Sequence, residues 1–458
     1  MRSSKAGVEP DYARCCGMVK LRAESWMSFA DKQPSIFLST VNRRLNILLS
    51  AYYCSPYKGS ESAVGWQTAI ALAKEHNITV LCGDLKLESP TGKDIEHYCQ
   101  QHELPSGLKI CHVQIKGIAS VIHRLHSLPG LWFLYYVAYR LWQLQAFEEA
   151  RKIHAEQPFD LAHHLTIIGY REPGYLWKLN IPFIWGPVAG ASTVPLSFIA
   201  DFGLKERFRW TTHHILNRIQ ISLGGRPERA AQAAAHVWAV SRKDQNMFKR
   251  WGRNAELMAE YGTEPIVAHP KTYEIGQKLL ICWSGLFQGS KALHLLLLAI
   301  VSLPHSLVEL HILGEGPEEA RWKQLACKLG LSGILVWHGK LPRDEALETM
   351  NTSHVQVITS LKEASSVVTF EALERGIPVI CHDACGMGIA IDESCGIKVP
   401  LQDPATSIKG FKKAIERLIA EPGLLTQLSQ GALARSNYLS RESNINRINK
   451  TYEVTISK

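Results

Sequence analysis

The sequence predicts an α/β protein made of two doubly wound, parallel-sheet (Rossmann-like) domains that face each other across a cleft. Two series of short apolar runs, with helical patterns between them, are typical of parallel βαβ units. A polar stretch with two prolines, residues 260–278, separates the two series and indicates a hinge. A chain of 458 residues is also long enough for each of two or three domains to bury its own core.

The first series of expected strands begins at Leu45. The run 45–53 predicts a strand, a glycine-containing loop follows, residues 66–75 predict a helix, and 78–83 predict the next strand. Further buried strands are expected at 108–115, 160–166, 182–187 and 236–241. We therefore expect an N-terminal domain over residues 45–265. Residues 1–44 carry no such pattern and are expected to be a flexible N-terminal extension.

The second series predicts a C-terminal domain over residues 266–458. Its expected strands lie at 279–285, 308–314, 333–339, 354–360 and 377–383, with helical patterns such as 317–330 between them. From Ser407 to the end the pattern is helical, and the last helix is a candidate to cross back to the first domain.

Composition excludes several classes of protein. The chain has 46% hydrophobic and 20% charged residues, which excludes extensive disorder. No uncharged apolar run reaches about 18 residues, so we expect no transmembrane helix. The nearest approach, residues 131–144, is short and interrupted by Arg140. The expected helix over residues 131–147 has aromatic residues all around it, which favours burial, with contact to a lipid surface as the alternative. Eleven scattered cysteines without a Cys-x-x-Cys pair indicate a reducing compartment, and we expect a cytoplasmic protein.

The net charge of +9 is spread along the chain. This favours contact with phosphates or with an anionic lipid surface over nucleic-acid binding. The most basic segment, residues 205–220, is either a solvated helix face or a contact for lipid headgroups or a lipid-linked diphosphate. Cys381, His382, Cys385 and Cys395 match no zinc spacing, and small buried cysteines explain them better.

The segment 358–383 carries the most chemical information. A strand is expected to end at Ser360, and a helix is expected to begin near Ser365. The free N–H groups and the positive dipole end of such a helix suit a diphosphate. Glu363 precedes the helix and Glu371 lies inside it, and carboxylates at such places can accept hydrogen bonds from ribose or hexose hydroxyls. Two surface glutamates of a helix would show the same spacing.

The whole pattern, Ser360-x-x-Glu363-x7-Glu371-Ala followed by Gly-x-Pro-Val-Ile, resembles the donor site of the family 4 retaining glycosyltransferases, the glycosyl transferases group 1. The segments 279–299, 313–319 and 336–345 fit the same family. The resemblance covers nearly everything from Leu45 onward and implies the GT-B fold. It also implies transfer of a sugar from a nucleotide diphosphate sugar to an acceptor hydroxyl with retained configuration, in assembly of surface polysaccharide, lipopolysaccharide or glycolipid.

The resemblance assigns roles to residues of the second domain. Glu371 is expected to hold the ribose, Glu363 to contact the transferred sugar, and Lys291 to neutralise the departing diphosphate. The backbone amides of Ala364, Ser365 and Ser366 are expected to bind sugar hydroxyls or phosphate. The implied partners are a nucleotide-sugar donor and a glycan or lipid-linked acceptor, with contact to an anionic membrane at the inner face of the cell membrane and no nucleic acid.

On the first domain the resemblance implies an acceptor-side loop at Gly59 and Ser60, where Ser60 and Glu61 are also expected to start a helix as a capping pair. It further implies a histidine beside the reacting sugar. His163 is the preferred candidate over His164, because adjacent residues of a strand point to opposite faces. A structural histidine is the alternative. No Asp-x-Asp motif occurs, so no metal and no other cofactor is required by any visible motif.

Two departures from the family pattern leave alternatives open. Leu286 stands where the family commonly has an arginine, with Arg343 or Lys362 as a stand-in, and the usual Gly-Phe-Gly run is replaced by Ala364–Ser366. The alternative functions are those of a nucleotide-sugar epimerase of the same architecture and of a degenerate, non-catalytic sugar-nucleotide-binding protein. A nicotinamide-dependent oxidoreductase is disfavoured because the loop after the first strand lacks Gly-x-Gly-x-x-Gly.

Overall fold

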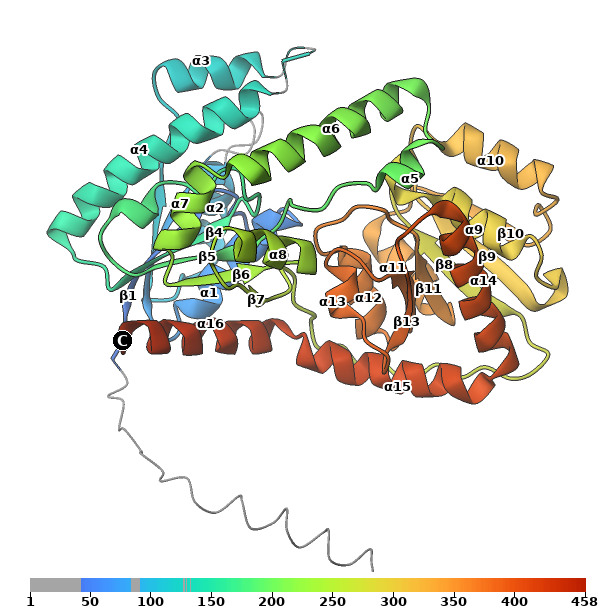
Figure 1. Ribbon diagram of the computed structural model, residues 1–458. Helices are drawn as coiled ribbons and strands as arrows, with labels where there is room; N and C mark the ends of the chain where they lie inside the picture. Colours follow the sequence, from blue (N-terminus) through green and yellow to red (C-terminus); the bar gives the residue numbers. More distant parts are fainter. Residues whose placement is uncertain (1–42, 84–90, 127, 129, 132) are drawn as a thin grey trace, which may run out of the picture. The chain divides into compact units, whose positions relative to one another are not determined.

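The computed structural model describes residues 43–83, 91–126, 128, 130–131 and 133–458. The expected N-terminal extension therefore lies outside the described residues, apart from its last two. The unit from Leu45 to Lys458 contains two parallel β-sheets with helices packed on their faces (Figure 1).

The first sheet has seven parallel strands in the order β3-β2-β1-β4-β5-β6-β7. The strands are β1 (Asn46–Ala51), β2 (Asn77–Cys82), β3 (Leu108–His112), β4 (Leu161–Thr166), β5 (Phe183–Val188), β6 (His236–Ala239) and β7 (Glu256–Leu257). The helices of this half are α1 (Glu61–Leu72), α2 (Thr91–Gln101), α3 (Ile118–Leu125), α4 (Leu134–Glu156), α5 (Leu196–Ile199), α6 (Leu204–Leu223), α7 (Arg226–Ala233) and α8 (Arg242–Arg250), with a 3-10 turn at Leu176–Lys178.

The second sheet has six parallel strands in the order β10-β9-β8-β11-β12-β13. The strands are β8 (Leu279–Ser284), β9 (Val308–Leu313), β10 (Leu335–Gly339), β11 (Val355–Ile358), β12 (Val379–His382) and β13 (Gly396–Val399). The helices are α9 (Leu293–Ile300), α10 (Glu319–Lys328), α11 (Arg343–Asn351), α12 (Val367–Glu374), α13 (Met387–Ala390), α14 (Pro404–Ala420), α15 (Pro422–Tyr438) and α16 (Arg441–Ile456), with 3-10 turns at Gly289–Lys291 and His305–Leu307.

Both sheets are covered on both faces, which is why their strands read as continuous apolar runs. In β1, Leu48 belongs to the core formed with α4, α7 and α8, whereas Ile47 and Leu49 belong to the core formed with α1 and α16. In β8, Ile281 packs in the core that includes α9, α10 and α14, and Cys282 packs in the opposite core with α12. The alternation of side chains along each strand divides them between two cores.

In each sheet the strand order reverses at one place, between β1 and β4 and between β8 and β11. Loops that leave the carboxyl ends of two such strands run in opposite directions and leave a crevice, where open α/β sheets bind their ligands. The topology therefore singles out two places for a site: the loops after β1 and β4, and the loops after β8 and β11.

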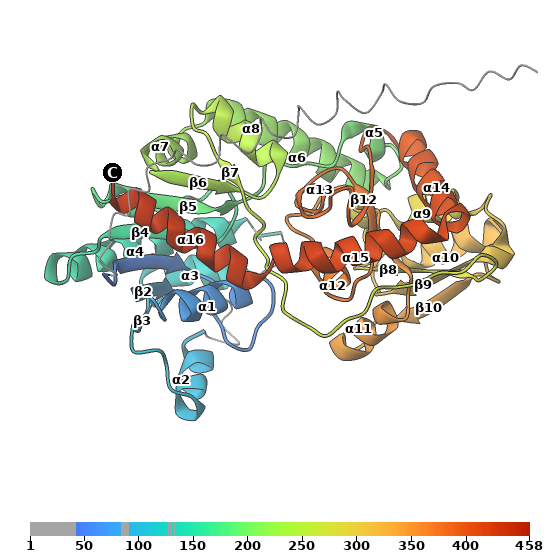
Figure 2. The ribbon, with the colours of Figure 1, turned by 90° about the horizontal axis from the view of Figure 1, so that it is seen from below.

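The C-terminal helix α16 packs against the first sheet, while α15 packs against α12 of the second (Figure 2). Ile445, Ile448 and Tyr452 of α16 share one core with the residues of β1 and α1. A further core joins the α5–α6 region, through Phe198 and Trp210, to α9 and to Leu361 in the loop after β11.

Strands β7 and β13 were not among the expected ones. β7 is only two residues long and β13 four, so neither carries a pattern that distinguishes a strand from a loop. Among the described residues no helix is both long and apolar enough to cross a membrane.

Candidate functional site

At the β8/β11 crevice, two loops are hydrogen-bonded to each other. The loop after β11 begins at Thr359, whose hydroxyl donates to the carbonyl of Lys291 at 2.6 Å. Two residues on, the N–H of Leu361 donates to the carbonyl of Ser290 at 2.8 Å. These bonds hold the 3-10 turn Gly289–Lys291 beside the loop that leads to α12.

Lys291 and Glu363 meet at this place as an ion pair, although 71 residues separate them in the sequence. Both side chains are largely buried. The backbone N–H of Glu363 also donates to the Cys385 thiol sulfur at 3.3 Å, which fixes the loop from its other side. The crevice thus contains the Lys291 ammonium and the Glu363 carboxylate, paired with each other. The ammonium could bind an anionic group of a ligand instead, and the carboxylate could bind a hydrogen-bond donor of a ligand.

The backbone of the loop presents free donors at the start of α12. Ser366 has a left-handed φ of 59° and forms no side-chain cap, so the N–H groups of the first turn have no protein side chain capping them. The loop lies against Gly386, where a Cβ atom would come within 2.4 Å of the carbonyl oxygen of Ala364 and within 2.6 Å of the Cα atom of Ser365. A helix start of this kind favours an anion.

Glu371 lies in the second turn of α12 and is mostly buried. One of its carboxylate oxygens is 2.8 Å from the Arg343 guanidinium, which reaches it from a largely exposed position. Burial raises the pKa of Glu371, and Arg343 opposes that shift. Residues 363–366 therefore precede α12, and Glu371 lies just over one turn inside the same helix.

Leu286 is half-exposed in the loop after β8. Next to it, Gly314 and Gly316 have φ angles of 129° and 152°, and a Cβ atom on Gly314 would lie 2.0 Å from the carbonyl oxygen of Gly285. Of the two stand-ins for the missing arginine, Arg343 is paired with Glu371, and Lys362 lies 5.3 Å from the centroid of the Trp210 ring.

At the β1/β4 crevice, Gly59 and Ser60 are exposed and precede α1. Ser60 has a φ of 58° and its side chain forms no cap, contrary to the expected capping pair. Instead the Glu61 carboxylate accepts a hydrogen bond from the backbone N–H of Ile168 at 2.9 Å, which ties α1 to the end of β4. Gly65 serves packing, since a Cβ atom there would lie 2.1 Å from the carbonyl oxygen of Tyr53.

The expectation that one of two adjacent histidines faces the cleft is corrected by the structure. His163 and His164 are both buried, because β4 is a central strand with a core on each face. His163 Nε2 donates to the carbonyl of Gly186 at 2.7 Å, so Nδ1 accepts from the Tyr452 hydroxyl at 2.6 Å. Burial lowers the pKa of His163 to about 4, which keeps it neutral. The structure does not bring His163 to the loop that holds Glu363.

Among the residues that the sequence did not single out, Glu260 lies after β7 near both crevices. Burial and the neighbouring Glu61 raise the pKa of Glu260 to about 8, and the Ser365 hydroxyl opposes the shift. A half-buried carboxyl with a raised pKa, next to the loop after β11, is a feature typical of functional sites. No local sequence pattern could have identified Glu260, because a single glutamate in a polar hinge is indistinguishable from a solvated one.

His382 and the cysteines near it have structural partners. His382 contacts the Ser360 carbonyl at 3.2 Å and the Ser407 hydroxyl at 3.0 Å, and both Cys381 and Cys395 are buried. Over the described ranges of the chain, no three His, Cys, Asp or Glu side chains converge as metal ligands would.

Comparison with known proteins adds a family match. Residues 266–435 match the family model described as glycosyl transferases group 1. A D-inositol 3-phosphate glycosyltransferase of Streptomyces bingchenggensis is 27% identical over 243 residues, which are 46% of this chain and 52% of that protein. The lipopolysaccharide core biosynthesis glycosyltransferase LpsE of Rhizobium meliloti is 28% identical over 184 residues, 39% of this chain and 52% of that protein. The chain thus spans about half the length of the curated relatives it matches.

Solved structures share the fold over most of the chain. Sucrose-phosphate synthase from Thermosynechococcus elongatus aligns with a TM-score of 0.59 at 17% identity, covering 90% of this chain and 100% of that one. The lipopolysaccharide outer core galactosyltransferase WaaB aligns with a TM-score of 0.59 at 13% identity, covering 88% and 98%. Anabaena Alr3699/HepE in complex with UDP aligns with a TM-score of 0.54 at 14% identity, covering 90% and 100%. The two parallel sheets therefore form a GT-B fold.

Proposed function

Residues 266–435 match the glycosyl transferases group 1 family, and from this match we propose that the chain is a retaining glycosyltransferase that moves a sugar from a nucleotide diphosphate sugar to an acceptor hydroxyl. The observation that carries the proposal is the Lys291–Glu363 ion pair beside the uncapped start of α12, at the carboxyl ends of β8 and β11. Glu371 lies in the second turn of the same helix.

Donor binding would exchange partners within the ion pair. The diphosphate would take the Lys291 ammonium and the N–H groups at the start of α12, and a sugar hydroxyl would donate to the released Glu363 carboxylate. Each new contact is a charge-assisted hydrogen bond, the stronger kind in proteins. The ribose hydroxyls would donate to Glu371, whose burial allows both bonds to form away from bulk water.

In the transfer itself, the bond from the anomeric carbon to the diphosphate oxygen breaks, and negative charge grows on the leaving phosphate. With the diphosphate bound at the start of α12, Lys291 and the helix dipole would lie where that charge develops, so they would stabilise the transition state more than the ground state. The departing phosphate takes the proton of the acceptor hydroxyl as the new glycosidic bond forms. This route needs no second carboxylate as nucleophile, and the described site offers no pair of carboxylates around one reacting carbon.

The names of the similar proteins guide the choice of substrates. HepE was solved with UDP, and the relatives act on an inositol phosphate and in lipopolysaccharide core biosynthesis. We therefore infer a UDP-sugar as the first donor to test. We place the reaction in assembly of surface polysaccharide, lipopolysaccharide or glycolipid.

The absence of an arginine at Leu286 is the observation behind the alternative of a degenerate, non-catalytic binding protein. With a leucine in place of an arginine, Lys291 is the one side-chain cation among the described residues that forms an ion pair with Glu363. Arg343 would have to leave Glu371 before it could contact the diphosphate. We therefore propose an active transferase that binds the diphosphate with lower affinity than an enzyme with both the arginine and the lysine would.

A thermal-shift screen with UDP, GDP, ADP and their common sugar conjugates tests the proposal. A ligand that binds only the folded state raises the melting temperature by mass action. We expect one nucleotide class to stabilise the wild-type protein and to stabilise Lys291→Gln less, with exposed Lys323→Gln as the matched control. No shift with any nucleotide would refute the donor site. Release of an epimerised donor without acceptor would favour the epimerase instead.

A further inference from the structure

Positive charge gathers on the first-domain side of the donor loop, next to Glu363. Lys362, the residue before Glu363, holds its ammonium 5.3 Å from the centroid of the Trp210 ring. Arg209 places its guanidinium carbon 4.9 Å from the same ring. Trp210 itself is buried in the second turn of α6, in the core that includes Leu361. An aromatic face thus holds two cations near the place proposed for the transferred sugar.

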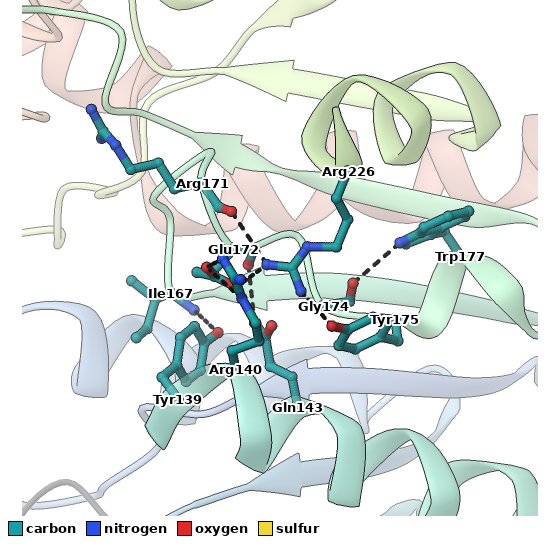
Figure 3. A network of polar contacts seen from close by, with 10 residues as sticks. All are labelled: Tyr139, Arg140, Gln143, Ile167, Arg171, Glu172, Gly174, Tyr175, Trp177 and Arg226. Carbon is teal, nitrogen blue, oxygen red and sulfur yellow. Dashed lines mark hydrogen bonds and ion pairs between the residues drawn. The ribbon is translucent and has the colours of Figure 1, made fainter. Parts of the chain in front are cut away.

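Arg171 adds a third cation to this group. Its guanidinium lies 4.5 Å from the Tyr170 ring centroid and donates to the amide oxygens of Gln220, at 2.6 Å, and Asn217. Figure 3 shows the Arg171 side chain turned away from the network around Glu172. Both of its hydrogen-bond acceptors are neutral, so they orient the guanidinium without balancing its charge.

The Glu172 carboxylate, from the residue next to Arg171, is paired with other arginines. Glu172 is bound by Arg140, at 2.5 Å, and by Arg226 (Figure 3). In the parts of the chain that the structure describes, no carboxylate lies within 4.0 Å of the Arg171 guanidinium or of the Lys362 ammonium. Glu206 is 3.7 Å from Arg209 and compensates that residue alone.

Burial and these positive charges lower the pKa values of neighbouring basic groups. Burial, followed by the charge of Arg171, lowers the pKa of Lys362. Burial, followed by the charges of Lys362, Arg171 and Arg209, lowers the pKa of His213 to about 4. Half-buried cations without an ion-pair partner are costly, and an anionic ligand would reduce that cost.

An apolar groove adjoins the charges. Tyr170, Arg171 and His213 line a groove of about 540 Å³ between α4 and α6. Its apolar walls are Phe133, Tyr136, Leu216 and Leu223, of which Leu223 is 76% exposed. On the helix α6 the exposed apolar side chains continue at Phe208, Ile215 and Ile219. A surface of this kind, with cations at one end, complements a molecule with an acidic head and an apolar chain.

Resting on the proposed function, we propose that the acceptor is an anionic amphiphile of the membrane, whose acidic headgroup binds at Arg171 and Lys362 and whose apolar chain lies in the groove between α4 and α6. Because Lys362 is next to Glu363, a headgroup held there presents its hydroxyl close to the transferred sugar. The substrate class is a phosphate-bearing or otherwise acidic lipid.

Vesicle co-sedimentation tests the proposal without donor. The probes are vesicles of phosphatidylcholine alone and of phosphatidylcholine mixed with phosphatidylglycerol, and a soluble arm titrates glycerol phosphate. The wild-type protein should prefer the anionic vesicles. Arg171→Gln and Lys362→Gln should each weaken that binding by about tenfold or more, the equivalent of one charge-assisted hydrogen bond. Leu216→Ser with Leu223→Ser should weaken vesicle binding and leave glycerol phosphate binding unchanged.

Matched controls come from α4, where Arg151 and Lys152 are exposed and paired with Glu148 and Glu149. Arg151→Gln and Lys152→Gln remove the same charges from the same domain and should change vesicle binding little. Equal losses in these controls would mean a diffuse charge effect and would overturn the proposal. Glycerol phosphate binding at Arg171 without any preference for anionic vesicles would assign the site to a free anion and would also overturn it.

The two proposals fail separately. Nucleotide affinity of Arg171→Gln should equal that of the wild-type protein. If nucleotides do not bind the wild-type protein at all, the donor site is refuted while vesicle binding still reports on the groove. If nucleotides bind and vesicles do not, the proposed transferase function is retained and the proposed lipid acceptor is refuted.

Discussion

The ribose assignment of Glu371 gives a prediction whose size follows from the structure. Glu371→Gln keeps the shape of the side chain and one acceptor oxygen but removes the charge. In the free protein the Glu371 carboxylate lies mostly buried, 2.8 Å from the Arg343 guanidinium. With nucleotide bound, it is expected to accept hydrogen bonds from both ribose hydroxyls.

Two charge-assisted hydrogen bonds contribute roughly 1.5–3 kcal/mol each, and the one neutral bond that glutamine keeps contributes roughly 0.5–1.5 kcal/mol. The expected loss of binding free energy is therefore about 2.5–4.5 kcal/mol, or roughly 70-fold to roughly 2,000-fold in Kd. Isothermal titration calorimetry with the stabilising nucleotide measures this directly.

Glu374→Gln is the matched control, since Glu374 lies on the same helix and is also buried. It pairs with Arg375 at 3.3 Å and accepts from the N–H of Glu264 at 2.7 Å. Its loss should lower stability and leave nucleotide affinity unchanged. Wild-type affinity in folded Glu371→Gln, or equal weakening in both variants, would refute the ribose assignment.

Four further predictions address catalysis and stability. Glu363→Gln should keep nucleotide affinity and lose turnover, so wild-type turnover in a sugar-transfer assay would contradict the sugar-contact role. Tyr452→Phe should lower the free energy of unfolding by about 1–3 kcal/mol, because the buried Nδ1 of His163 loses its donor, and an unchanged denaturant midpoint would contradict this. Gly65→Ala should cost about 1–3 kcal/mol or more, because the new Cβ would lie 2.1 Å from a carbonyl oxygen, and an unchanged melting temperature would count against it. Since burial raises the pKa of Glu260 from 4.5 to about 8, the folded state binds this proton more tightly, and stability should fall as pH rises from about 5 to about 8; if Glu260→Gln shows the same fall, the assignment is wrong.

The sequence was sufficient for the architecture, and the family resemblance named the residues that meet in the β8/β11 crevice. Parallel strands end at the same edge of a sheet, so the loops after β8 and β11 must lie together at the point where the order reverses. That rule alone brings Lys291 near Glu363 across a long separation in sequence. The helix start after Ser366 was visible because the apolar strand before it ends sharply.

Burial of particular side chains was harder to predict because it depends on which elements pack together. In α4 the aromatic residues lie all around the helix, and the structure buries Tyr139 and Trp142 while leaving Phe133 and Tyr136 about half-exposed. The expected burial of this helix was therefore correct for one face only. Alternation along β4 predicted one exposed histidine, but α16, from the far end of the chain, covers the face that holds His163.

The most direct test of the central claim is a structure of the protein with a nucleoside diphosphate bound. We predict diphosphate oxygens at the first turn of α12 and beside Lys291, ribose hydroxyls within hydrogen-bond distance of Glu371, and an opened Lys291–Glu363 pair. A nucleotide bound at the loops after β1 and β4, or one that leaves the Lys291–Glu363 pair closed, would contradict the account.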